Sequence, residues 1–247
     1  LKSRANQQPH SVRKMSNKDT EQAPFSTIDR LSGTGKGTLS ALVAKKLHWH
    51  MLDSGAIYRA AAWAALHQSV SPTDHNALIT LLQSNKIELK LSDPGTPARV
   101  FCANTEITEA IRTEHCGLLA SKISAVPAVR DYLLRYQHDF RQWPGLVADG
   151  RDMGTVIFPD AKIKFFLTAN ETTRAERRQE QLQAKGINVS LREVLGDLQA
   201  RDDRDKQRDI APATPSKTAI LLDTTHLDID TVFKEVWQSI ASQRTGQ

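Results

Sequence analysis

The chain has 247 residues, of which 39% are hydrophobic and 25% charged, which is enough for one α/β core with a smaller inserted lobe. Its formal net charge of +5 is concentrated in residues 1–22, where five Lys or Arg accompany two acids, and the rest lacks the basic stripe interleaved with aromatics that would indicate nucleic-acid binding. The longest apolar run, at 60–66, is too short to cross a bilayer, and no apolar leader segment follows the N-terminal charges, so we expect a protein that contacts no membrane. The two cysteines lack metal-site spacing and are expected to be free thiols, so we expect the protein to be cytoplasmic.

The most informative segment lies between a predicted strand at 25–28 and a predicted helix at 39–47. It is Ser-Gly-Thr-Gly-Lys-Gly-Thr, over residues 32–38. Glycines let successive backbone N–H groups converge on an anion, Lys36 adds a mobile charge, and the hydroxyl of Thr38 lies near the metal that accompanies a nucleoside triphosphate. The segment therefore predicts a phosphate-binding loop at the N-terminus of a helix.

The loop departs from the full pattern G-x-x-x-x-G-K-[ST], because Arg30 stands where the first glycine is expected. A side chain there obstructs the close backbone approach that glycine allows. We expect either a loss of ATP affinity or an Arg30 side chain that swings outward or pairs with Asp29. The hydroxyl also follows one residue late, after Gly37, an arrangement typical of small-metabolite and nucleotide kinases and not of GTPases.

Past the loop, the spacing of apolar residues predicts alternating helices and strands. Residues 52–55 are predicted as a turn in which Ser54 caps a helix that runs to about His67. Further helices are predicted at 74–84, 108–123, 127–142, 171–185, 191–205 and 228–242. Strands are predicted at 86–91 and 99–102, as a small antiparallel insertion, and at 146–148, 163–167 and 219–222. This order predicts an α/β fold with an open, doubly wound parallel sheet.

Three further strings accompany the loop: Leu-Asp-Ser-Gly-Ala-Ile-Tyr-Arg at 52–59, Ala-Asp-Gly-Arg-Asp-Met-Gly-Thr at 148–155, and Arg-Asp-Asp-Arg-Asp at 201–205. With these four strings, in order over residues 24–242, the chain resembles bacterial cytidylate kinases, which are nucleoside monophosphate (NMP) kinases of the phosphate-loop class. Each string alone is suggestive, and the four together are specific.

The resemblance implies one kinase domain of the P-loop NTPase class, at 23–242, followed by a short tail at 243–247. The basic tail at 1–22 is polar and lacks periodicity, so we expect it to be disordered. It also implies an inserted, β-containing NMP-binding lobe at about 54–142 and a short helical lid at about 171–210.

The resemblance further implies which residues bind ATP and Mg²⁺. ATP is expected on Arg30, Leu31, Ser32, Gly33, Thr34, Gly35, Lys36, Gly37 and Thr38. Thr38 and Asp149 are expected to hold Mg²⁺, although the position of Asp149 at a strand end is equally consistent with a helix cap. Three arginines resemble those of a lid that folds over ATP, and any one of them is equally consistent with a surface position: Arg174, Arg177 and Arg178.

The acceptor implied by the resemblance is CMP or dCMP. Its dianionic phosphate needs several guanidiniums, and the matching residues are Ser54, Arg59, Arg151 and Arg208. The family's cytosine contacts match Ser121, Arg130 and Asp152, where a carboxylate suits the amino group that uracil lacks. Arg201 and Asp205 are expected at the ribose, and they share one helix face with Arg208 because the three stand at i, i+4 and i+7.

Phosphoryl transfer needs positioning and charge rather than a side-chain nucleophile. The residues expected to act on the transferring group are Lys36, Asp149, Arg151, Arg201 and Arg208. A monomer is expected. Two alternatives stay open at this point: another P-loop kinase, for UMP, AMP or shikimate, and a non-catalytic nucleotide-binding protein whose loop is damaged at Arg30.

Overall fold

The computed structural model describes residues 23–34, 37–90, 93, 98–184 and 186–245. The predicted basic tail, Gly35, Lys36 and most of the segment between the strands predicted at 86–91 and 99–102 lie outside the described residues.

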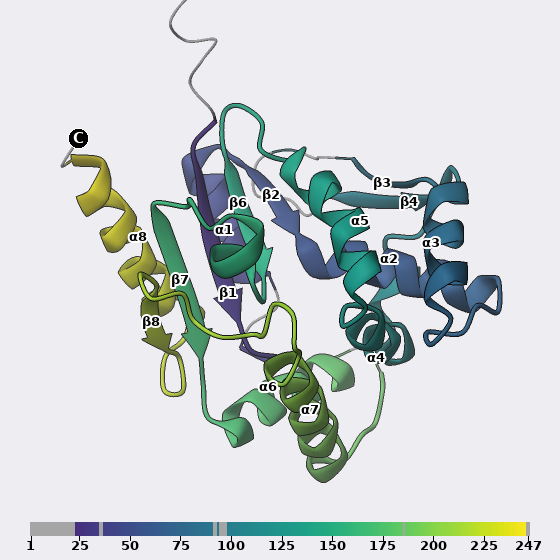
Figure 1. Cartoon of the computed structure of the whole chain (residues 1–247). Coiled ribbons are helices and arrows are strands. Elements are labelled where there is room, and N and C mark those ends of the chain that lie inside the picture. The colour runs from purple at the N-terminus through teal and green to yellow at the C-terminus, as the bar shows by residue number, and fades with distance from the viewer. Residues whose placement is uncertain (1–22, 35–36, 91–92, 94–97, 185, 246–247) are drawn as a thin grey trace, which may run out of the picture.

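A five-stranded parallel sheet forms the centre of the fold (Figure 1). Its strands, in spatial order, are β2 (His50–Asp53), β6 (Leu146–Gly150), β1 (Phe25–Arg30), β7 (Ile163–Thr168) and β8 (Ile220–Asp223). All neighbours pair in parallel, and β1 and β6 are buried along nearly their whole length. The predicted α/β class with a parallel sheet is confirmed. Because β1 is central, the loop after it opens at the middle of the sheet's carboxyl edge.

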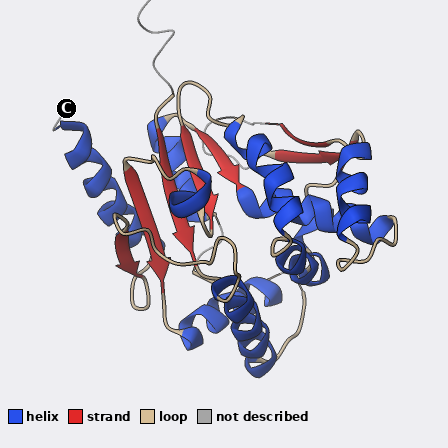
Figure 2. Cartoon of the chain, viewed as in Figure 1, coloured by secondary structure: helices blue, strands red, loops and turns tan. Residues whose placement is uncertain are grey.

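Helices flank both faces of this sheet (Figure 2). One face is covered by α1 (Thr38–Leu47) and α8 (Ile229–Thr245), whose apolar side chains join those of β1 and β7 in one core cluster, for example Val43, Phe165 and Val236. The opposite face contributes Leu52 and Ala148 to a larger cluster that extends into the helices between β2 and β6. Burial on both faces is what fixes a parallel sheet of this kind.

The segment between β2 and β6 forms a lobe beside the sheet. Its elements are α2 (Ser54–His67), α3 (His75–Ser84), β3 (Ile87–Lys90), β4 (Arg99–Cys102), β5 (Thr105–Glu106), η2 (Ala110–Arg112), α4 (Glu114–Ile123) and α5 (Pro127–His138). The three strands make an antiparallel sheet in the order β3-β4-β5. The small antiparallel insertion predicted from the period-two pattern is therefore confirmed.

Two helices, α6 (Glu171–Gln183) and α7 (Leu191–Lys206), lie together at the end of the sheet to which the strands point (Figure 1). Ala175, Leu182, Val194 and Leu198 pack them into a small core of their own. Ser190 begins α7 with a capping box, in which its side chain accepts from the backbone N–H of Glu193. This is the region predicted as the lid.

Several local predictions are wrong. The predicted turn at 52–55 is instead the end of β2 and the first two residues of α2. Asp53 rather than Ser54 caps α2, since its Oδ1 accepts from the backbone N–H of Ala56 at 3.2 Å. The strand forms because β2 pairs with β6, a contact that the local sequence does not reveal.

Helix ends also differ from the prediction. The helix predicted from 108 starts at Glu114, after η2, because the Thr113 side chain accepts from the backbone N–H of Cys116 and caps α4 there. The helix α8 continues to Thr245, beyond the predicted boundary at 242. A π-helical segment, η3 (Met153–Ile157), was not predicted. Among the described residues, no helix combines the length and the apolar character of a membrane span.

Candidate functional site

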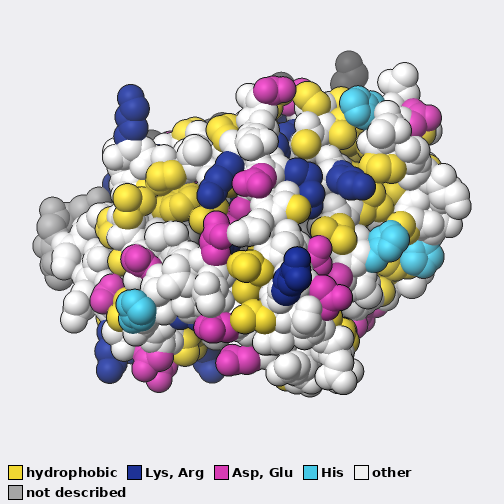
Figure 3. Space-filling model, turned by 90° about the horizontal axis from the view of Figure 1, so that it is seen from below, with side chains coloured by type: hydrophobic (Ala, Val, Ile, Leu, Met, Phe, Trp, Pro, Cys, Tyr) yellow, Lys and Arg dark blue, Asp and Glu magenta, His cyan; other side chains and the backbone are white. Residues whose placement is uncertain are grey.

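A cavity of about 1040 Å³ opens at the carboxyl ends of β1, β2 and β6, between the sheet, the lobe and α7. Its charged lining is mixed, and Figure 3 shows Lys, Arg, Asp and Glu side chains together on the face seen from below. In an α/β sheet with this topology, ligands bind outside the carboxyl ends of the strands. All nine residues predicted for CMP line this cavity: Ser54, Arg59, Ser121, Arg130, Arg151, Asp152, Arg201, Asp205 and Arg208.

The phosphate loop forms one end of the cavity. Gly33 and Gly37 take the left-handed backbone conformation, with φ of 81° and 58°. A Cβ on Gly33 would lie 2.8 Å from the backbone oxygen of Arg174, so only glycine fits there. Gly37 directly precedes α1, and the loop therefore joins a strand to a helix N-terminus as predicted.

The residues predicted for ATP divide into three groups. Arg30, Gly33, Gly37 and Thr38 line the cavity. Three others are buried within the loop and do not line it: Leu31, Ser32 and Thr34. Gly35 and Lys36 lie outside the described residues.

Arg30 and Asp149 form a bidentate ion pair. Arg30 Nε donates to Asp149 Oδ1 and Nη2 donates to Oδ2, both at 2.8 Å. The expectation that Arg30 swings outward or pairs with Asp29 is wrong. Thr38 and Asp149 supply a hydroxyl and a carboxylate in one cavity, which are oxygen ligands of the kind Mg²⁺ prefers, so the donor set fits the metal although Arg30 already contacts both carboxylate oxygens.

Asp29 instead points to the segment after β6. Its two carboxylate oxygens accept from the backbone N–H groups of Met153 and Gly154, each at 2.7 Å. Burial raises the pKa of Asp29 to about 7, even though these two hydrogen bonds lower it. Sequence reasoning gave Asp29 no role beyond a partner for Arg30.

Three arginines at the other end of the cavity lack a carboxylate partner among the described residues. Arg59 donates through Nη1 to the backbone oxygens of Ile111 and Thr113, at 2.8 and 2.9 Å. Arg201 Nε and Arg208 Nη2 are buried without a hydrogen-bond partner. Burial lowers the pKa of all three, that of Arg201 to about 9. These guanidiniums stay charged at neutral pH and can satisfy their donors on phosphate oxygens.

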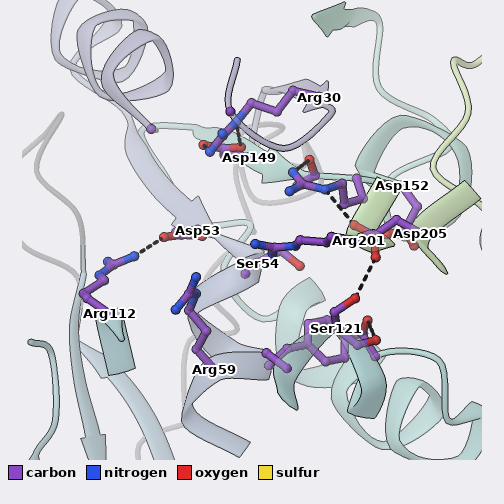
Figure 4. A pocket seen from close by; sticks show the side chains of 18 of the residues that line it. Arg30, Asp53, Ser54, Arg59, Arg112, Ser121, Asp149, Asp152, Arg201 and Asp205 are labelled. Atoms are coloured by element: carbon purple, nitrogen blue, oxygen red, sulfur yellow. Dashed lines mark hydrogen bonds and ion pairs between the residues drawn. The ribbon is translucent and has the colours of Figure 1, made fainter. Parts of the chain in front are cut away.

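The carboxylates near these arginines are held by other groups. Asp205 Oδ2 accepts from Arg151 Nε at 3.2 Å and its Oδ1 from Ser121 Oγ at 3.3 Å. Asp152 forms a buried ion pair with Arg130, whose Nη1 also donates to the backbone oxygen of Ser124 at 3.2 Å. Figure 4 shows Arg30 and Asp149 at the loop end of this cavity, and Arg201, Arg59 and Ser121 away from it.

Sequence reasoning did not single out Asp53, Arg112 or Ser124, which also line the cavity. Arg112 Nη1 donates to Asp53 Oδ2 at 3.0 Å, and although burial opposes ionisation, Arg112 outweighs it and the pKa of Asp53 is lowered. Ser124 Oγ accepts from Arg208 Nη1 at 3.3 Å. Asp53 belongs to the string at 52–59, so the sequence held a signal that could have identified it. Arg112 and Ser124 belong to none of the four strings, and no local pattern identifies them.

The three predicted lid arginines do not line the cavity. Arg174 Nη1 donates to the backbone oxygen of Ser32 at 2.9 Å and pairs with Asp202. Arg177 donates to Thr224 and to the backbone oxygen of Leu227. Arg178 forms an ion pair with Glu114. In this structure all three hold α6 against its neighbours.

The chain is similar in sequence to known proteins that share one family name. A family model described as cytidylate kinase matches residues 26–242. A protein of Coxiella burnetii named cytidylate kinase is 50% identical over 218 residues, which cover 88% of this chain and 92% of that protein. Proteins of the same name from Pseudomonas syringae pv. tomato and Aeromonas salmonicida are 48% and 46% identical, covering 89% and 92% of this chain and 96% and 97% of their own.

The raised pKa of Asp29 predicts a pH-dependent stability. Because the folded chain holds the proton up to about pH 7 and the unfolded chain releases it near pH 4, the free energy of unfolding should fall as pH rises through this window, by about 1.4 kcal/mol per pH unit from this group. Asp29→Asn removes the titration. The free energies of unfolding of both proteins are measured with urea at a series of pH values. The difference between them should change from pH 4 to pH 7 and stay constant above pH 7. A difference that is the same at every pH would contradict the raised pKa of Asp29.

Arg201→Met should separate binding from stability. Removing a buried donor that has no partner should change the free energy of unfolding by less than about 1 kcal/mol, while CMP binding measured by calorimetry weakens roughly 10- to 100-fold. Arg177→Met is the control, since its hydrogen bonds lie outside the cavity. It should lower stability and leave CMP affinity unchanged. The reverse pattern for the two variants would rule out this role of Arg201.

Proposed function

This chain belongs to the cytidylate kinase family, and from that premise we propose that it is an ATP-dependent NMP kinase, which transfers the γ-phosphate of ATP to CMP or dCMP. The observation that carries the proposal is one cavity that joins a glycine-rich loop at a helix N-terminus to Arg59, Arg201 and Arg208, which have no carboxylate partner within the described part of the chain. The first suits a triphosphate and the second suits an acceptor phosphate.

The acceptor phosphate binds at the arginine end of the cavity. Arg59, Arg201 and Arg208 supply positive charge, and Arg151, held by Asp205 and by Ser32 Oγ at 3.1 Å, places a fourth guanidinium toward the loop. Ser54 also lines this part of the cavity. Its hydroxyl donates to Gln137 Oε1 at 2.7 Å, and this hydrogen bond fixes the orientation of the hydroxyl group. Arginine is suited to this task because its planar fork binds two phosphate oxygens at once.

Recognition of the base rests on Asp152, Arg130 and Ser121. The ion pair with Arg130 holds Asp152 in one orientation, and a carboxylate can accept from the amino group of cytosine. Uracil offers an oxygen there, which the carboxylate repels. Asp205 and Arg201 meet the ribose and distinguish a 2′-hydroxyl only weakly, so both CMP and dCMP are substrates.

In the reaction, an oxygen of the acceptor phosphate attacks the γ-phosphorus of ATP, the new P–O bond forms, and the bond to the ADP oxygen breaks. No side chain becomes covalently attached. The chain's residues align the two phosphates and spread positive charge over the transferring group, and α6 and α7 exclude water whose attack would hydrolyse ATP. Lys36, outside the described residues, would act at the β- and γ-phosphates.

Thr38 and Asp149 would hold Mg²⁺, which when bound supplies charge on the phosphate oxygens. We also propose a cytoplasmic monomer, because one chain lines the whole cavity and Cys102 and Cys116 are free and buried. Light scattering that gives a mass near 27.5 kDa would support the monomer, and a dimer's mass would exclude it.

The function is tested with an acceptor panel. Coupled ADP release should be seen with ATP, Mg²⁺ and either CMP or dCMP, and should be at least about tenfold lower in kcat/KM with UMP, AMP or shikimate, because one misplaced hydrogen bond to the base costs about 1–3 kcal/mol. A folded protein that shows no turnover with CMP would refute the proposal and favour a non-catalytic nucleotide-binding protein.

Two variants accompany the panel. Asp152→Asn should lower kcat/KM for CMP about 10- to 100-fold and narrow the preference for CMP over UMP. Asp160→Asn is the matched control, because Asp160 is exposed and pairs with Arg141 away from the cavity. It should behave as the unaltered protein. Equal loss with CMP and UMP in Asp152→Asn would show that Asp152 does not recognise the base.

A further inference from the structure

At the loop end of the cavity, where ATP is proposed to bind, the chain supplies a positive charge of its own, the guanidinium of Arg30. Arg30 Nε and Nη2 each donate to one oxygen of the Asp149 carboxylate, at 2.8 Å. The Asp149 side chain is only 1% exposed and that of Arg30 12%, so solvent screens the pair little. A bidentate pair of this geometry is among the stronger ion pairs that proteins form.

The pair lies where the loop meets α1. Asp149 is in register with Ile28 of β1, two residues before Arg30, so both side chains emerge on one face of neighbouring strands. A Cβ on Gly37 would lie 3.8 Å from Asp149 Oδ2, so the carboxylate faces the residue directly before Thr38. The guanidinium therefore contacts the same carboxylate that a metal beside Thr38 would use.

The electrostatics favour the pair as it stands. The bidentate contact sets the positive charge of Arg30 directly against both oxygens of the Asp149 carboxylate. A divalent cation that approaches Asp149 meets a carboxylate already neutralised by a positive charge. It must either displace the guanidinium or share the carboxylate with it at close range, and like charges at such distances repel.

We propose that Arg30 is an internal competitor of the divalent cation at Asp149, so that the metal strengthens ATP binding much less in this chain than it would with a neutral residue at position 30. The proposal rests on the proposed function in that ATP is the nucleotide at the loop. It assigns the competition to the charge of Arg30 rather than to its bulk, and the two are separable by substitution.

The test compares ATP binding by calorimetry in excess Mg²⁺ and in EDTA, without CMP so that no transfer occurs. In the unaltered protein Mg²⁺ should tighten binding less than about threefold. In Arg30→Met, which keeps most of the bulk and removes the charge, Mg²⁺ should tighten it about tenfold or more, and Arg30→Gly, which restores the motif residue, should respond at least as strongly. Arg141→Met is the control, because it breaks the Arg141–Asp160 pair outside the cavity and should leave the metal response unchanged.

A second measurement needs no nucleotide. Without Arg30 the buried Asp149 carboxylate has lost its partner, so Arg30→Met should melt at lower temperature in EDTA and regain several degrees in excess Mg²⁺. Asp149→Asn added to Arg30→Met should abolish that gain. The unaltered protein should show little change with Mg²⁺.

Each outcome decides the proposal. An unaltered protein that responds to Mg²⁺ as strongly as Arg30→Met, or an Arg30→Met protein that does not respond, would overturn it. If only Arg30→Gly responds, bulk rather than charge is responsible and the proposal is also overturned. If no protein binds ATP, the proposed function fails, and the melting temperatures still decide whether Arg30 competes with the metal.

Discussion

Buried ion pairs between arginine and aspartate hold the carboxyl edge of the sheet in its arrangement. They are Arg30–Asp149, Arg130–Asp152, Arg151–Asp205 and Arg174–Asp202. In each, the carboxylate is almost entirely buried, and a buried charge that loses its partner is strongly destabilising. The pairs therefore decide which segments meet: two strands in the first, the lobe and the strand end in the second, the strand end and α7 in the third, and α6 and α7 in the last.

One loop residue, Ser32, links two of these pairs, Arg151–Asp205 and Arg174–Asp202. The backbone N–H of Ser32 donates to Asp202 at 3.3 Å, its backbone oxygen accepts from Arg174, and its hydroxyl accepts from Arg151. Since Arg151 also binds Asp205, the loop, α6, α7 and the acceptor side of the cavity share one hydrogen-bonded network. A movement of α6 and α7 must change the contacts of the phosphate loop, which is a physical basis for coupling closure to nucleotide binding.

The sequence predicted the fold class and most elements because apolar periodicity and loop chemistry are local signals. It also placed Arg201 and Asp205 on one face of α7, since residues at i and i+4 share a helix face, but the same prediction is wrong for Arg208, because α7 ends at Lys206. It did not predict the partner of Arg30. Adjacent residues on a strand point to opposite faces, so Asp29 and Arg30 diverge, and the true partner comes from β6, 119 positions away. Pairing across strands depends on register, which the local pattern does not contain.

The two ends of the cavity differ in their balance of charge. At the loop end, Asp149 neutralises Arg30 and its carboxylate raises the pKa of that arginine. At the end proposed for the acceptor, Arg59 donates to backbone oxygens, and Arg201 and Arg208 keep buried donors that find no partner among the described residues. Burial lowers the pKa of all three. A dianionic phosphate can neutralise the positive charge of these arginines without breaking an ion pair. A metal–nucleotide complex at the loop end must first disturb the Arg30–Asp149 ion pair. On the assignment proposed above for the two ends, the chain's own charges favour the acceptor monophosphate over the metal-bound donor.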